Sequence, residues 1–220
     1  VGILFIGFDV DAETAWIGNN PSNVDRMVTT SHGGYDARVG IARILGLMDE
    51  LGLDWQEYAA RKGHLTTFDE PLGTWHDQAL FLALVDRAAG HQFRHFVQCG
   101  YEPFARAAQD TLKEEYGHIG LGMDAVKELL QTPEGRANVG SVLHKWLAIG
   151  LQSFGGEQSP KNERYRYWGI KQDTNEAMRE TYWQQVRAFI TKDWGFELPE
   201  DWRAIWSPGK PGDDTVERAY

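Results

Sequence analysis

Glu115 and His118 stand three positions apart in residues 112–123, LKEEYGHIGLGM, a stretch with helical periodicity. Residues at this spacing share one side of a helix, so a carboxylate oxygen and an imidazole nitrogen can reach a common metal ion from one turn. The pair falls on the same side as much of the apolar stripe, which favours a position inside a helical bundle. The alternative is a surface Glu/His pair without a ligand, because such pairs occur at the same spacing.

A second acid with the same potential is Asp86, in the preceding segment QALFLALVDRAAGHQFRHF. Leu82 lies one turn before it and Gly90 one turn after it, so this carboxylate belongs to an apolar stripe. Because burial of a lone carboxylate is costly, the position requires a metal ion, a cation or a proton as its partner. The alternative is an ion pair with Arg87 or another base at the edge of the bundle.

Helical segments after residue 73 would position these three side chains. Pro103 suits the first turn of one helix, and Pro133 suits the start of the next. The tight connection CGYEPF joins the helix of Asp86 to a returning helix that carries Glu115 and His118. The sequence predicts helices over 74–98, 101–131, 134–153 and 172–194, with a long connection over 155–169.

The first part of the chain has a different rhythm. An apolar run predicts a buried strand, and a Gly/Asn/Pro/Ser loop and an amphipathic helix ended by Gly52 follow it. Such a unit normally leads to a second parallel strand, and none follows. The predicted strand is 3–8 and the helix is 37–51; the predicted domains are 1–52, 53–207 and a flexible tail over 208–220.

Composition excludes several functional classes. The formal net charge of −10 argues against nucleic acid or an anionic membrane as a partner, because both require a basic surface. The single cysteine, Cys99, excludes an internal disulfide framework and is typical of a reducing cytoplasm. The apolar opening VGILFIGF spans eight residues, which is too short for a membrane helix or a typical signal peptide. We expect a cytoplasmic globular protein.

Three separated blocks resemble one family in the same order: LVDRAAG, YEPFARAAQDTLKEEYGH and SPKNERYRYWGIKQDTNEAMRETYWQQV. They are similar to the catalytic subunit of the phenylacetyl-CoA epoxidase (phenylacetic acid catabolic) family of ferritin-like di-iron oxygenases, over about residues 54–200. The resemblance implies a mainly α fold, a partial ferritin-like bundle behind the short N-terminal α/β segment. It also implies that Asp86, Glu115 and His118 correspond to three of the family's six iron ligands.

The same resemblance implies a chemistry and partners. Family members activate O2 at two irons to epoxidise the ring of an aryl-CoA thioester, and they work with a reductase and a structural sister subunit. Basic residues within the last block could meet CoA phosphates, or could belong to a solvated linker. These residues are Lys161, Arg164, Arg166 and Lys171.

The sequence also departs from the family. Members carry a further helix with a Glu ligand and a further Glu-x-x-His helix before the matched part, whereas this chain has no second Glu-x-x-His. We therefore expect a truncated or hybrid oxygenase subunit with half a metal site, or a catalytically inactive helical interaction protein. A homodimer is another possibility, since two copies each of Asp86, Glu115 and His118 would form the full set.

A second resemblance concerns residues 1–52. FDVDAETAW and SHGGYDARVGIARILGLMDELG are similar to the opening of the polysaccharide deacetylase family. This implies Asp9 as general base and Asp11 as a ligand of zinc, in a metal-dependent deacetylase. The alternative is a solvated loop at a strand end. His91 and His95 have the spacing of the family's histidine pair, but they belong to the helical part, where we expect them to face the surface or a partner.

Overall fold

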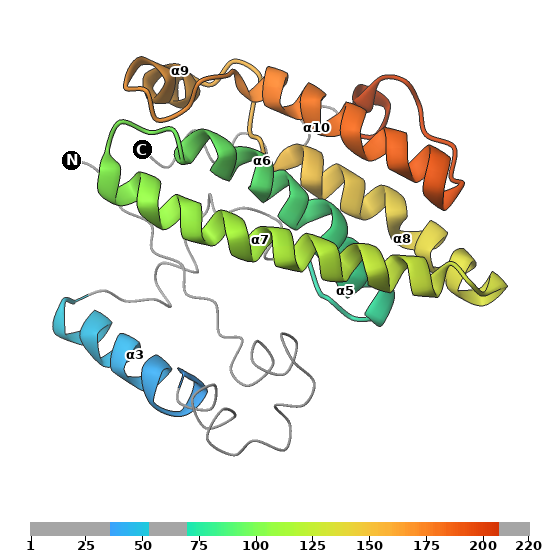
Figure 1. Cartoon of the computed structure of the whole chain (residues 1–220), viewed down its shortest axis with the longest axis horizontal. Helices are drawn as coiled ribbons and strands as arrows, with labels where there is room; N and C mark the ends of the chain where they lie inside the picture. The colour runs from blue at the N-terminus through green and yellow to red at the C-terminus, as the bar shows by residue number, and fades with distance from the viewer. Residues whose placement is uncertain (1–35, 53–69, 207–220) are drawn as a thin grey trace. The chain divides into compact units, whose positions relative to one another are not determined.

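The computed structural model describes residues 36–52 and 70–206. Its chain divides into two compact units, Val1–Arg61 and Lys62–Tyr220. The described residues contain helices and no strand, so the mainly α fold is confirmed for this part of the chain (Figure 1). The predicted strand over 3–8 and the predicted tail over 208–220 lie outside the described residues.

The first unit contributes one described helix. A π-helical turn, η2 (Asp36–Gly40), leads directly into α3 (Ile41–Glu50), and Gly52 follows with a φ of 67°. Only glycine adopts this left-handed backbone without strain, so Gly52 ends the helix as predicted. None of the residues of α3 is buried.

The second unit is built of helices that pack on one another. The helical bounds agree with the predicted segments to within three residues, and two of these segments contain a π-helical turn. In chain order the elements are α5 (Trp75–Leu80), η4 (π-helix, Phe81–Val85), α6 (Asp86–Phe96), α7 (Glu102–Leu129), α8 (Pro133–Gln152), α9 (Pro160–Tyr167), α10 (Asn175–Phe189), η5 (π-helix, Ile190–Trp194) and η6 (3-10 helix, Trp202–Ala204).

Hydroxyl side chains begin most of these helices. The Oγ atoms of Thr74, Thr132, Ser159 and Thr174 each accept a hydrogen bond from the backbone N–H three residues later. Proline occupies the first turn of α7, α8 and α9, where its missing N–H costs no helical hydrogen bond. The predicted long connection over 155–169 contains a helix that was not predicted, because Ser159 and the proline after it begin α9 inside that segment.

The helices form a bundle around an apolar and aromatic core. α7 lies along the α5–η4–α6 rod and runs antiparallel to it, and α8 and α10 also contact this rod (Figure 1). Large aromatic side chains fill the centre: Trp146, Trp183 and Trp202 are each at most 1% exposed. These three tryptophans are therefore packing residues.

A fully buried arginine ties the end of the described chain to the bundle. Arg179 on α10 donates from Nε to the carbonyl of Leu151 at 2.9 Å and from a terminal nitrogen to the carbonyl of Gly155. Its guanidinium lies 4.8 Å from the ring centroid of Trp202 and 4.5 Å from that of Trp206. Carbonyl dipoles and the faces of aromatic rings thus stabilise the positive charge of the Arg179 guanidinium.

Among the described helices, none is long and apolar enough to cross a membrane.

Candidate metal centre

Asp86, Glu115 and His118 converge between two antiparallel helices. Asp86 is the first residue of α6, and the other two lie in the middle of α7. One ligand atom from each side chain lies within 4.8 Å of the other two, and Asp86 Oδ2 is 3.8 Å from His118 Nδ1. The structure therefore brings together the three residues that spacing and resemblance selected.

The cluster is partly shielded from solvent. The Asp86 side chain is 12% exposed and the His118 side chain 31% exposed. Ala83, Leu84, Val85 and Ala88, on the turns next to Asp86, are all buried. Of the predicted apolar stripe, Gly90 is buried and Leu82 is partly buried. These apolar surroundings strengthen electrostatic interactions by keeping water from one side of the cluster.

Arg87 does not take the role that the alternative interpretation gave to it. Its Nε donates to the carbonyl of Ala83 at 3.0 Å, and its guanidinium lies 4.8 Å from the centroid of the Phe189 ring. Arg87 therefore faces α10, whereas Asp86 faces α7. Burial lowers the pKa of Arg87.

The donor set suits iron. Two carboxylates and one imidazole are the hard and intermediate ligands that di-iron carboxylate proteins use, and a Glu-x-x-His turn is the unit from which such sites are built. Two carboxylates so close together also repel each other unless a cation or a proton lies with them. Within the described ranges, this is the one group of three His, Cys, Asp or Glu side chains close enough to share an ion.

A π-helical turn directly precedes Asp86. The backbone N–H of Asp86 donates to the carbonyl of Phe81, five residues back, as in a π-helix. The hydroxyl of Tyr182 on α10 donates to the carbonyl of Leu84 in the same turn, at 3.1 Å. Sequence reasoning missed both features, because a π turn has no composition signal and Tyr182 is 98 residues from Leu84 in the chain.

His91 and His95, which were expected to face the surface or a partner, are less exposed to solvent than that expectation implies. His91 is 7% exposed, and its Nε2 lies 2.8 Å from Gln185 Oε1 on α10; burial lowers the pKa of His91. His95 Nδ1 lies 2.8 Å from Gln172 Oε1, with its side chain 16% exposed. The expectation that both face the surface or a partner was wrong for His91, which helps to fasten α6 to α10.

The basic residues predicted to meet CoA phosphates differ in their exposure to solvent. Arg164 and Arg166 are exposed on α9, and Lys161 is partly buried. Lys171 is 8% exposed, and its Nζ donates to Gln92 Oε1 at 3.1 Å. Burial lowers the pKa of Lys171 to about 8. Asp9 and Asp11, the residues of the deacetylase interpretation, lie outside the described residues.

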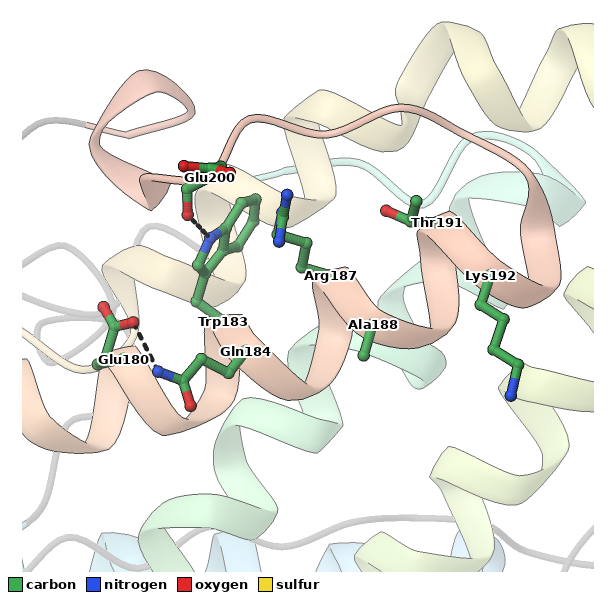
Figure 2. A pocket seen from close by; sticks show the side chains of 8 residues that line it. All are labelled: Glu180, Trp183, Gln184, Arg187, Ala188, Thr191, Lys192 and Glu200. Atoms are coloured by element: carbon green, nitrogen blue, oxygen red, sulfur yellow. Dashed lines mark hydrogen bonds between the residues drawn. The ribbon is translucent and has the colours of Figure 1, made fainter.

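A separate hollow of about 500 Å³ lies along the outer side of α10 (Figure 2). The acidic residues Glu180 and Glu200 lie toward one end, and the basic residues Arg187 and Lys192 lie toward the other. Trp183 Nε1 donates to the carbonyl of Glu200 at 2.8 Å. None of the predicted site residues lines this hollow. Its lining consists of Glu180, Trp183, Gln184, Arg187, Ala188, Thr191, Lys192 and Glu200.

A family model and a known protein match the helical part of the chain. The family model described as "Phenylacetic acid catabolic protein" matches residues 49–215. One of the subunits of 1,2-phenylacetyl-CoA epoxidase from Escherichia coli (strain K12) is 29% identical over 125 residues, which are 56% of this chain and 40% of that relative. The matched region thus spans less than half of the relative's length. Because the family model covers most of the sequence, the chain belongs to the phenylacetic acid catabolic protein family.

Proposed function

We propose that this chain is a subunit of a di-iron oxygenase related to the phenylacetyl-CoA epoxidases, and that Asp86, Glu115 and His118 hold iron. The observation that carries the proposal is the convergence of these side chains to within 4.8 Å from two antiparallel helices. The match to one component of a phenylacetyl-CoA epoxidase supports the reaction class. The substrate class that follows is an aryl-CoA thioester, with O2 as the second substrate.

Each of the three residues has a distinct part in this proposal. Asp86 and Glu115 supply negative charge that balances a cationic centre, and either carboxylate can bridge two ions. His118 supplies a neutral imidazole as a terminal ligand. Iron, when bound, supplies the reduction of O2 that ring epoxidation requires. The buried residues on the turns beside Asp86 limit the access of water to the centre.

The three ligands are half of the set that two irons require. In di-iron bundles, two helices each give a Glu-x-x-His turn and two others each give an acid. The remaining ligands therefore come from outside the described residues or from another chain. A reductase and a structural sister subunit remain the expected partners, because the epoxidase relative is itself named as one subunit. Cytoplasmic location stays part of the proposal.

Iron binding tests the proposal directly. The purified chain is loaded with Fe2+ without oxygen, passed through a desalting column and assayed for iron per chain. We expect bound iron and a near-ultraviolet band that changes on exposure to O2. Asp86→Asn, Glu115→Gln and His118→Gln should each lower the bound iron at least tenfold, since each removes a ligand.

Matched variants of exposed neighbours serve as controls. Asp124→Asn and Glu114→Gln on α7, and His144→Gln on α8, make the same chemical changes at exposed positions. These variants should retain the iron of the parent chain. Equal iron content in all six variants would contradict the assignment of the centre, and absence of iron from the parent chain would contradict the proposed function.

A further inference from the structure

The turn that leads into Asp86 has an extra residue. Since the N–H of Asp86 bonds to the carbonyl of Phe81, the hydrogen-bonded span at η4 is one residue longer than in an α-helix. One additional residue rotates everything after it by about 100° relative to a regular α-helix. The π turn therefore determines which side of the rod carries the Asp86 carboxylate, and in this structure that side faces Glu115 and His118.

Side chains hold the carbonyls of this turn. The carbonyl of Leu84 accepts from Tyr182 Oη, and the carbonyl of Ala83 accepts from Arg87 Nε. Tyr182 is 0% exposed, and burial raises the pKa of its hydroxyl, which therefore remains a donor at neutral pH. The backbone hydrogen bonds of a π turn are less regular than those of an α-helix. Side chains that donate to its carbonyl groups therefore stabilise the turn.

Two glycines let neighbouring helices approach the same turn closely. A Cβ atom on Gly122 of α7 would lie 2.4 Å from the backbone N of Ala83, a distance that no side chain tolerates. A Cβ atom on Gly150 of α8 would lie 2.5 Å from Tyr182 Oη and 3.5 Å from the carbonyl oxygen of Leu84. The turn is therefore enclosed by α7, α8 and α10 together.

We infer that Tyr182 is a positioning residue of the metal centre, which acts through the carbonyl of Leu84 to keep the π turn and so the direction of Asp86. The inference rests on the proposed function of Asp86 as an iron ligand. Tyr182 itself belongs to α10 and is not part of the ligand cluster. Its effect on metal binding is transmitted by the backbone of η4.

Tyr182→Phe tests this inference, because it removes the donor and keeps the ring. The metal is Co2+, whose visible absorption reports ligand number and geometry. We expect the Co2+ dissociation constant to rise roughly tenfold, the loss typical of residues that orient a ligand, and the visible spectrum to change. The control is Tyr167→Phe, at a side chain that is 86% exposed, and it should retain the parent affinity and spectrum.

A second readout does not depend on metal. Crystal structures of the metal-free parent and Tyr182→Phe chains should show Asp86 Oδ2 farther from His118 Nδ1 in the variant than the 3.8 Å seen here. If Tyr182→Phe merely lowers thermal stability and keeps the parent's affinity and spectrum, the inference is overturned. If the parent binds no Co2+, the proposed function fails, and the position of Asp86 in the two crystal structures alone decides the inference.

Discussion

At the scale of single residues, two acids in this bundle accommodate their charge in different ways. Asp77 is 6% exposed and accepts hydrogen bonds from the hydroxyl of Thr74, the ammonium of Lys145 and the indole of Trp146. Asp86 instead lies beside a second carboxylate, Glu115, and an imidazole. Asp77 is thus a structural acid satisfied by donors, whereas Asp86 belongs to a cluster of side chains that could hold a metal ion.

Asp77 makes the stability of the protein depend on pH. Burial by itself raises the pKa of Asp77, but hydrogen bonds from Thr74, Lys145 and Trp146 outweigh it and lower the pKa from 3.8 to about 2. Because the folded pKa lies below the unfolded one, this stabilisation is present above pH 3.8 and is lost as the pH falls towards 2. Urea unfolding at several pH values between 5 and 2 measures this loss of stabilisation.

The variant Asp77→Asn removes the charge with little change in shape. At pH 6 we expect it to lower the free energy of unfolding by about 1–3 kcal/mol, because Lys145 and Trp146 lose a charged acceptor. The difference between parent and variant should shrink as the pH falls from 4 to 2. Asp124→Asn, at an exposed position, is the matched control. If the free energies of unfolding of the parent and of Asp77→Asn differ by the same amount at every pH, this explanation is contradicted.

Residue spacing and the family resemblance together selected Asp86, Glu115 and His118, and the spacing is informative because positions three and four apart share a helix face whatever the tertiary structure. The network of Asp77 could not be found in this way. Lys145 and Trp146 are 68 and 69 residues from Asp77 in the sequence, and only the packing of α5 on α8 brings them to its carboxylate. Contacts between distant segments leave no periodic signal.

At the scale of elements, the sequence predicted the long helices well and their irregularities poorly. Apolar periodicity and the prolines at the first turns located α7 and α8 to within two residues. The π turn η4 was not predicted, because its contacts with Tyr182 of α10 and with Gly122 of α7 join segments that are far apart in the sequence. Helix α9 was missed because its residues are mostly exposed and carry no apolar stripe.

The packing of α7 on η4 requires glycine at one position. Gly122→Ala places a methyl group 2.4 Å from the backbone N of Ala83, so the two helices must separate. We expect a loss of about 1–3 kcal/mol in the free energy of unfolding, as for other overpacked cores. Urea unfolding with an unchanged m-value provides the measurement.

Gly120→Ala is the control for this substitution on the same helix. No atom lies within 4 Å of a Cβ built at Gly120, which is exposed. Since alanine is the better helix former, we expect Gly120→Ala to stabilise the chain by about 0.4–1 kcal/mol. If both substitutions change the free energy of unfolding equally, close packing on η4 does not explain why position 122 requires glycine.

At the scale of the whole molecule, the described residues bring one acid and one Glu-x-x-His turn together, and the match covers 40% of the epoxidase relative. The sequence predicts a half site, since it has only one Glu-x-x-His. It could not show where the other ligands come from. The division into domains at residue 53 also stays a prediction.

Metal should stabilise the folded chain as a whole. A ligand that binds only the folded state at one hundred times its dissociation constant adds about 2.7 kcal/mol to the free energy of unfolding. We therefore expect anaerobic Fe2+ to raise the melting temperature of the parent chain and a chelator to reverse the rise. Asp86→Asn should show no such rise. Sedimentation velocity of the same samples tests the alternative that two copies of the chain form the full ligand set. This alternative requires that iron convert the monomer to a dimer.

The assignment of iron to the space between α6 and α7 can be checked by anomalous X-ray diffraction at the iron absorption edge. Crystals of the iron-loaded chain should give an anomalous peak within coordination distance of Asp86, Glu115 and His118. A peak elsewhere on the chain, or none between α6 and α7 in crystals that contain iron, would contradict the assignment.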